Sequence, residues 1–209
     1  MSPLGMHLAP WTVQPFGDDA LRIVLPDDAC LPALERGLAS TPGIVDWVLT
    51  EGFAMLRLAT APALPDELLG SLRRWAAERT PAPGTTHVVP VRYDGPDLVA
   101  SAASLGLSTE ELVAQHVAAP YVVRFIGFLP GFAYLGPLPE RLRLPRRPSP
   151  RPRVPAGAVA IAGPFTAVYP HASPGGWHLL GHAVGSLPFD PAVGCRLRLG
   201  DAVRFEAVP

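Results

Sequence analysis

The sequence contains no lysine, and all 17 of its basic residues are arginines. This absence excludes from the chain every site built on a lysine amine: the phosphate-binding lysine of a P-loop, a Schiff base and a biotinyl-lysine. We therefore expect no covalently bound cofactor. A bound phosphate would have to meet arginine guanidinium groups or backbone N–H groups instead.

Cysteine, long apolar runs and net charge are also scarce. Cys30 and Cys195 are far apart and form no CxxC motif, so we expect free thiols in a cytoplasmic protein. No apolar run approaches about 18 residues and no charged region precedes an apolar block at the N-terminus, so we expect neither a transmembrane helix nor a signal peptide. A net charge of −1 gives no electrostatic footprint for nucleic acid or an anionic membrane.

The first part of the chain alternates strand and helix patterns. Strand patterns lie at 11–17 and 20–25, and a hairpin pattern lies at 43–59. Helix patterns lie at 27–40 and 65–80, and the first of these begins with acidic residues. This order predicts an α+β unit with its helices on one face of an antiparallel sheet. A Pro/Gly stretch at 81–84 is the expected linker to the second part.

The second part begins with mixed elements and becomes rich in short strands. A strand is expected at 87–95 and helices at 96–106 and 108–118, and Ser108 with Glu111 fits a capping box. Short apolar runs then alternate with Pro/Gly clusters, which is typical of an all-β sandwich or barrel. These runs are 121–127, 158–163, 166–170, 177–184, 195–200 and 202–208.

The stretch 127–136, GFLPGFAYLG, places Phe128, Phe132 and Tyr134 on a backbone rich in glycine and proline. Glycine and proline favour turns, whereas aromatic side chains favour burial. Two interpretations follow. The stretch is either a buried hairpin corner that packs into the barrel, or a stiff apolar wall at the edge of a cleft or a subunit interface.

His178 and His182 form an HxxxH pair without the glutamate of an HExxH motif. Residues four apart share a face on a strand as well as on a helix. Zinc ligation, lining of a pocket and an ordinary surface or core role are the three alternatives, and no metal site is predicted. His87 and His116 have no partner in sequence and are expected to be structural.

An arginine-rich loop and a glycine pair are the remaining candidates. The loop at 143–153 could hold a phosphate or carboxylate by bidentate contacts, or it could be a solvated extended segment. Gly175 and Gly176 could form an anion nest or a tight turn before a strand. Asp201 is expected to be a turn residue.

Three blocks in order, GFLPGFAYLG, PRRPSPRPRVPAGAVAIAG and VYPHASPGGWHLLGH, resemble the family of the 5-oxoprolinase B subunit. The same family includes KipI-type kinase inhibitors and the allophanate hydrolase subunit 1, or carboxyltransferase subdomain C and D, proteins. The resemblance implies a ferredoxin-like α+β domain at 1–84 and a cyclophilin-like β-barrel domain with a short helical insertion at 85–209.

The resemblance also implies an activity and partners. Together with subunits A and C, such a chain would help to cleave 5-oxo-L-proline to L-glutamate. The co-substrate would be ATP, bound with Mg. The chain would be inactive alone. One alternative is a KipI-type inhibitor that binds a histidine kinase. Another is a carboxyltransferase component of the urea amidolyase type, which would need a separate biotin protein.

Four positions depart from the family pattern. Ala158 stands where serine is usual, Phe165 where glutamine is usual, Ala167 where glycine is usual and His182 where arginine is usual. Loss of the glutamine removes an amide that could hold a lactam or nucleotide. Histidine in place of arginine exchanges a permanent bidentate cation for a titratable group.

The resemblance together with these patterns predicts a small-molecule site. Its expected acid–base residues are His178 and His182. The walls of the cleft are expected to be Phe128, Phe132, Tyr134, Phe165 and Trp177. The glycines expected to let the backbone approach the ligand are Gly131, Gly175 and Gly176. The residues expected to bind phosphate or carboxylate are Arg146, Arg151 and Arg153.

Overall fold

The structure of the chain is a computed structural model that describes residues 9–27, 29–60, 66–78, 84–185, 189–190 and 194–209. It divides into two compact units, Met1–Ala82 and Pro83–Pro209. Residues 81–83 of the expected linker lie outside the described residues. Each unit has its own secondary structure and core, so the two are described separately.

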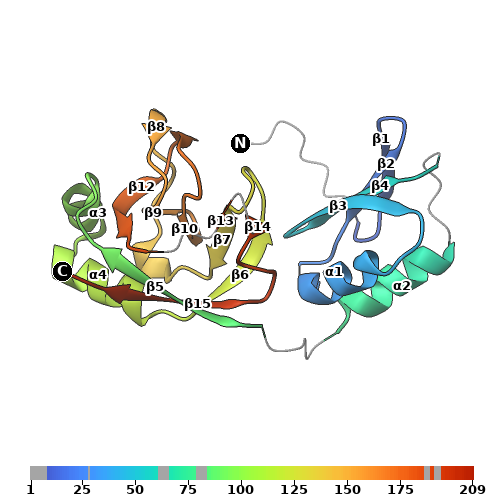
Figure 1. The fold of residues 1–209 in the computed structure, drawn as a ribbon, viewed down its shortest axis with the longest axis horizontal. Helices are drawn as coiled ribbons and strands as arrows, with labels where there is room; N and C mark the ends of the chain where they lie inside the picture. The colour runs from blue at the N-terminus through green and yellow to red at the C-terminus, as the bar shows by residue number, and fades with distance from the viewer. Residues whose placement is uncertain (1–8, 28, 61–65, 79–83, 186–188, 191–193) are drawn as a thin grey trace. The chain divides into compact units, whose positions relative to one another are not determined.

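The first unit is a four-stranded antiparallel sheet with two helices on one face (Figure 1). Its strands β1 (Val13–Phe16), β2 (Ala20–Val24), β3 (Ile44–Thr50) and β4 (Phe53–Leu58) lie in the order β1-β2-β4-β3. The expected hairpin is confirmed, and Gly52 in its turn has a φ of 85°, a conformation that glycine adopts without strain.

The helices α1 (Leu31–Ala39) and α2 (Asp66–Ala76) pack against each other. The indole ring of Trp75 lies directly on the backbone of Gly37, where any Cβ atom would collide with it. Helix α1 begins at Leu31 and not at residue 27 as expected, because proline in its first turn sets the start. The predicted acidic first turn of this helix is therefore wrong.

The second unit contains a closed seven-stranded barrel, which confirms the barrel and not the sandwich. The strands follow one another in the order β10-β7-β6-β15-β5-β12-β9. Strands β15 and β5 run parallel, and the other described neighbours run antiparallel. The bounds are β5 Thr86–Arg92, β6 Tyr121–Ile126, β7 Ala133–Gly136, β9 Ala158–Ala162, β10 Phe165–Val168, β12 His178–Ala183 and β15 Ala202–Ala207.

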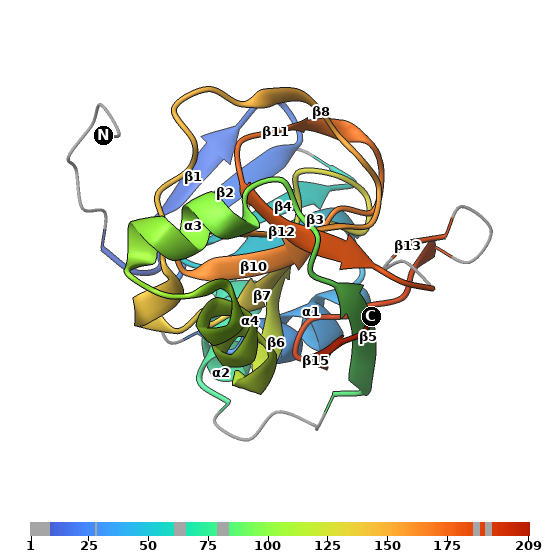
Figure 2. The same ribbon diagram turned by 90° about the vertical axis from the view of Figure 1, so that its left-hand side faces the viewer.

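Three short helices and two small ribbons complete this unit. The helices are α3 (Leu98–Leu105), α4 (Thr109–Ala118) and the 3-10 helix η1 (Glu140–Leu142), and both halves of the predicted capping box at Ser108 are present. One ribbon pairs β8 (Arg151–Val154) with β11 (Ser173–Gly175), and the other pairs β13 (Phe189–Asp190) with β14 (Gly194–Cys195). The ribbon of β8 and β11 lies over one side of the barrel (Figure 2).

The strand expected at 195–200 is wrong beyond Cys195, because the chain turns there. The Asp201 carboxylate accepts a hydrogen bond from the Arg198 N–H at 2.9 Å and from the Thr85 N–H at 2.8 Å. Asp201 is thus the expected turn residue. It also fixes the start of β15 beside the start of β5.

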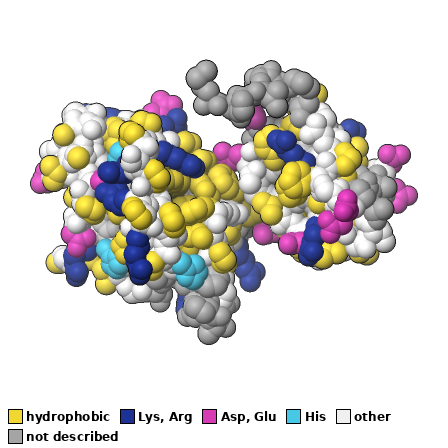
Figure 3. Space-filling model, turned by 90° about the horizontal axis from the view of Figure 1, so that it is seen from above, with side chains coloured by type: hydrophobic (Ala, Val, Ile, Leu, Met, Phe, Trp, Pro, Cys, Tyr) yellow, Lys and Arg dark blue, Asp and Glu magenta, His cyan; other side chains and the backbone are white. Residues whose placement is uncertain are grey.

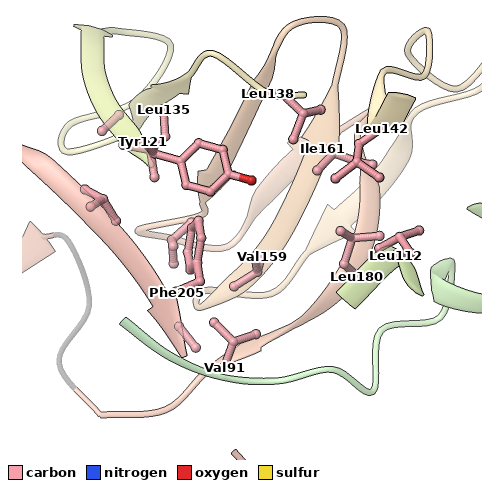
Figure 4. Packing of buried hydrophobic residues seen from close by; sticks show 14 of the residues in the cluster. Val91, Leu112, Tyr121, Leu135, Leu138, Leu142, Val159, Ile161, Leu180 and Phe205 are labelled. Carbon is pink, nitrogen blue, oxygen red and sulfur yellow. The ribbon is translucent and has the colours of Figure 1, made fainter. Parts of the chain in front are cut away.

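On strand β9, large aliphatic residues face the barrel lumen and small residues face outward. On β9, Val159 and Ile161 belong to the core that fills the barrel, together with Phe205 and Tyr121 (Figure 4). The alternate residues of β9 are alanines that belong to a second cluster on the outside. The period of two in side-chain direction therefore gives this unit two apolar cores.

His116 on α4 is fully buried and hydrogen-bonded at both ring nitrogens. Its Nδ1 lies 2.7 Å from the Tyr93 hydroxyl and its Nε2 lies 2.9 Å from the Thr166 hydroxyl. Its ring stacks on Phe205 with centroids 4.7 Å apart. Burial lowers the pKa of His116 to about 3, so the ring is neutral and structural, as expected.

No helix among the described residues is long and apolar enough to cross a membrane. Neither cysteine is in a disulfide, as predicted; Cys30 is partly exposed and Cys195 is exposed.

The buried neutral His116 predicts acid sensitivity. The pKa of His116 is about 3 in the folded protein, and the ordinary value, which applies to the unfolded chain, is 6.5. Between these two pH values the unfolded state binds a proton that the folded state excludes. The free energy of unfolding should fall as the pH falls through this range, by up to about 1.4 kcal/mol per pH unit from this residue. Urea unfolding of the wild type and of His116→Gln at several pH values should show a shallower dependence in the variant. Parallel curves would contradict the assignment.

Candidate functional site

A cluster of aromatic side chains covers the outer face of the barrel. Phe132, Tyr169 and Trp177 are buried there against the outward-facing alanines of β9 and β10. Beside them is a cavity of about 170 Å³, which we call the aromatic groove. On the face seen in Figure 3, hydrophobic side chains of the second unit gather beside arginines. The groove is lined by Phe128, Phe132, Tyr134, Arg146, Pro150, Tyr169, Pro174, Gly175, Gly176 and Trp177.

The glycine-rich stretch forms a tight loop between β6 and β7 that carries two of these rings. The Gly127 N–H donates to the Phe132 carbonyl at 3.1 Å. Gly131 and Phe128 have φ values of 76° and 70°, and this conformation is strained for a phenylalanine. The loop buries Phe132 to 1% exposure and leaves Phe128 60% exposed. One ring therefore anchors the loop in the second core, and the other ring borders the groove.

The rings contact one another edge to face, which makes the groove wall stiff. The Phe132 centroid lies 5.0 Å from that of Tyr134, and Trp177 lies 5.5 Å from Phe132 and 5.6 Å from Tyr134. Such arrangements are favourable for aromatic pairs and fix the ring planes. The wall therefore exists before any ligand binds.

A second hollow of about 390 Å³ adjoins the groove and shares Tyr134, Arg146 and Trp177 with it. Phe165 borders this hollow and contacts Phe125 and Tyr134 edge to face, with centroids 5.3 Å and 5.6 Å apart. The phenylalanine that departs from the family pattern thus adds another apolar wall. The two hollows together can hold a flat, mostly apolar molecule next to the positively charged side chain of Arg146.

The glycine pair serves packing more than ligand approach. Gly175 lies against the Tyr169 hydroxyl so closely that a Cβ atom would collide with it. A Cβ on Gly176 would meet only ordinary contacts, at 3.8 Å from the Arg147 carbonyl oxygen. The Gly176 carbonyl accepts a hydrogen bond of 2.8 Å from the Arg147 N–H, which ties the arginine loop to this segment.

The arginines expected to bind an anion separate into three environments. Arg146 lines both hollows. Arg151 donates instead to the Asp97 carboxylate at 2.7 Å, and Arg147 donates to the same oxygen at 2.9 Å. Arg153 is exposed on β8 and does not line either hollow. The expectation for Arg151 is therefore corrected, because its guanidinium group serves a structural ion pair.

Asp97 is the buried centre of this ion pair. Its other oxygen accepts from the Leu179 N–H at 2.7 Å, so one carboxylate joins α3, the arginine loop and β12. Burial alone would raise the pKa of Asp97, but hydrogen bonds from Arg151 and Leu179 and the charges of Arg151 and Arg147 lower it overall. The carboxylate is ionised at neutral pH and holds the loop that carries Arg146.

The two histidines expected to act as acid and base do not line the aromatic groove. His178 lies with Nε2 2.9 Å from the carbonyl oxygen of Pro145, the neighbour of Arg146. His182 is exposed further along β12, where its ring packs against Gly157. Among the described residues, no three histidine, cysteine or acidic side chains gather as they would around a metal ion.

Two tyrosines, Tyr134 and Tyr169, line the groove as neutral groups. Burial raises the pKa of Tyr169 to about 12, and burial also raises the pKa of Tyr134. Both phenols therefore keep their protons at neutral pH and can donate hydrogen bonds. They cannot serve as bases without a large change in environment.

The structure also places the other departures from the family pattern. Ala158 and Ala167 are buried on the outer barrel face, where they pack beneath the aromatic cluster. Neither lines the groove. Their small size fits the second core, and His182 at the surface has no groove contact.

Sequence reasoning missed Tyr169 and Asp97. Tyr169 adjoins Pro170 in one of the three family blocks, so that block was the available signal. Asp97 resembles any helix-start aspartate in sequence. Its arginine partners lie 50 and 54 residues away, and no local pattern indicates such a pairing.

Comparison with known proteins gives three informative matches. The family model for the carboxyltransferase domain, subdomain C and D, matches residues 11–192. A curated relative from Escherichia coli O157:H7, named as the B subunit of 5-oxoprolinase, is 44% identical over 179 residues, which cover 82% of each protein. The crystal structure of TTHA0988 matches with a TM-score of 0.78 and 37% identity over 95% of this chain and 40% of that chain. The chain thus spans about two fifths of the length of that solved structure.

The crystal structure of the K. lactis urea amidolyase matches with a TM-score of 0.71 over 99% of this chain and 15% of that chain. At 18% identity this similarity concerns the fold alone.

The buried carboxylate predicts a stability cost on substitution. Asp97→Ala leaves the Arg147 and Arg151 guanidinium groups without their shared partner. It should lower the free energy of unfolding by roughly 2–4 kcal/mol, somewhat less than for a fully buried pair because both arginines are partly exposed. Chemical unfolding would measure the change. Asp46→Ala, on the exposed part of β3, is the control, and an equal effect of both would contradict the central role of Asp97.

Proposed function

The chain belongs to the carboxyltransferase domain, subdomain C and D, family, and we propose that it is the B subunit of an ATP-dependent 5-oxoprolinase. In this role it helps to activate the lactam of 5-oxo-L-proline for hydrolysis to L-glutamate. The similarity to the Escherichia coli relative supports the proposal, since it covers 82% of both chains. The observation that carries it is the preformed aromatic groove with Arg146 at its border.

The groove suits a small lactam acid. A cavity of about 170 Å³ is smaller than the sites of drug-sized ligands, and its aromatic walls match a flat five-membered ring. The Arg146 guanidinium group can pair with the carboxylate of the substrate. The neutral Tyr169 and Tyr134 hydroxyls can donate to the lactam oxygen.

ATP fits this chain only in part. Arg146 is the one arginine among the described residues that lines the two hollows, and a triphosphate carries more charge than one guanidinium group balances. ATP, when bound, supplies a phosphoryl group that makes the lactam oxygen a better leaving group. Further cationic or Mg-binding groups would come from subunits A and C, so this chain alone would be inactive.

The residues of this chain have distinct roles in the proposal. Trp177, Tyr134 and Phe132 bind the ring and exclude water from it. Arg146 orients the substrate, and Phe128 borders the entrance. His178 is a positioning residue, because its bond to the Pro145 carbonyl holds the backbone next to Arg146. No proton transfer is assigned to His182.

The finer architecture belongs to the same proposal. The first unit would be ferredoxin-like: β2-α1-β3-β4-α2 follows the first five elements of the βαββαβ motif, and β1 pairs with β2 at the edge. The second unit is a cyclophilin-like barrel. The complex would work in the cytoplasm, where the two cysteine thiols stay reduced.

Substitution in the groove tests the proposed activity. In the complex reconstituted with subunits A and C, Arg146→Gln should lower kcat/KM for 5-oxoproline-dependent ATP hydrolysis by about ten- to a hundredfold, because a charge-assisted hydrogen bond is lost. Arg153→Gln, on exposed β8 outside the groove, is the matched control and should keep wild-type activity. Size-exclusion chromatography would check assembly. Unchanged ATPase activity in both Arg146→Gln and Trp177→Ala would overturn the site.

The positioning role of His178 gives a separate prediction. His178→Leu removes the donor to Pro145 and should raise KM several-fold with a smaller change in kcat, because Arg146 loses its orientation. His178→Gln, which can donate to the same carbonyl, should restore much of the loss. A fall in kcat alone that glutamine does not restore would indicate a direct chemical role instead.

A further inference from the structure

A second cavity, of about 330 Å³, opens at one end of the barrel lumen. Ala133, Leu135, Val168 and Val203 line it, and all four belong to the core that fills the barrel. Val168 and Val203 lie two residues along β10 and β15 from Thr166 and Phe205, which contact His116. The cavity therefore lies toward the end of the lumen away from His116.

This lumen cavity is separate from the aromatic groove. The two sets of lining residues have no member in common. Strand β7 divides them, since Tyr134 faces the groove while Ala133 and Leu135 face the lumen. Mouths of β-barrels are common positions for small-molecule sites.

A hydrogen-bonded pair of polar side chains, His87 and Asp201, lies at the lumen cavity. His87 lines it, and its Nε2 lies 2.9 Å from the Asp201 carboxylate. Asp201 is buried and also accepts from the Thr85 and Arg198 N–H groups. Because the carboxylate can only accept, the imidazole holds a proton on Nε2, and in the neutral form of the ring Nδ1 is an acceptor.

His87 Nδ1 has no hydrogen-bond partner among the described residues. A carboxylate that orients a histidine in this way fixes both its tautomer and its ring plane. The arrangement thus offers a preoriented acceptor beside aliphatic walls. Arg196, which is exposed, also lines this cavity.

We propose that the lumen cavity is a second ligand site, which takes a small aliphatic primary amide with its chain in the lumen. The amide N–H donates to His87 Nδ1, and the amide oxygen accepts from Arg196. The aliphatic chain packs against Ala133, Leu135 and Val168, which gives the burial that drives binding. A carboxylate at the polar end has no proton to donate to Nδ1 and binds less well.

Pentanamide and pentanoate, added to the full chain, test the site by methyl and aromatic NMR. Pentanamide should shift the methyl signals of Leu135, Val168 and Val203 in a saturable manner and leave the Trp177 ring signals in place. Pentanoate should bind several-fold more weakly. Shifts centred on Trp177, tighter binding of pentanoate or no saturable shift would each overturn the proposal.

Two variants with a matched control identify the contacts. His87→Phe keeps a ring but removes the acceptor, and should weaken pentanamide binding about tenfold. Ala133→Leu fills the lumen end and should abolish binding. His182→Phe, an exposed histidine outside the cavity, should bind like the wild type. If Ala133→Leu fails to fold, His87→Phe still tests the proposal, because an unchanged affinity for pentanamide in that variant would contradict the assigned contact.

Discussion

Alternation of side chains around a closed barrel is the constraint on which both cavities and both cores depend. Each strand presents successive residues to the lumen and to the outside. On β9, valine and isoleucine fill the lumen while alanines leave space outside for an aromatic layer. On β7, Tyr134 faces the groove while Ala133 and Leu135 face the lumen cavity. A shift of one residue in register would destroy both arrangements at once.

Three buried polar side chains hold the connections of this barrel in place. Asp97 joins the arginine loop to β12, Asp201 joins the starts of β5 and β15, and His116 closes the lumen from α4. Each makes hydrogen bonds with at least two partners, so none of these three side chains is buried without a partner. The groove residue Arg146 lies in a loop that two hydrogen bonds keep in position, one between Arg147 and buried Asp97 and one between Pro145 and His178.

Much of the local structure followed from the sequence, because local rules decide it. The hairpin at Glu51-Gly52, the amphipathic α2 and the capping box at Ser108 all depend on residues within a few positions. The predicted start of α1 and the predicted strand at 195–200 were wrong, since a proline sets the helix start and a turn closed by the Asp201 carboxylate interrupts the apolar run. The aromatic wall was expected, but the capture of Arg151 by Asp97 was not.

The sequence by itself determined most of the strands and helices, the absence of lysine chemistry and the family blocks that contain Phe132, Tyr134 and Trp177. Only the tertiary structure decided which of the candidate groups share a cavity. Arg146 borders the groove, Arg151 is held by Asp97, and His178 supports the loop from outside. Closure of the barrel brings together residues separated by tens of positions, and no spacing rule along the chain records that geometry.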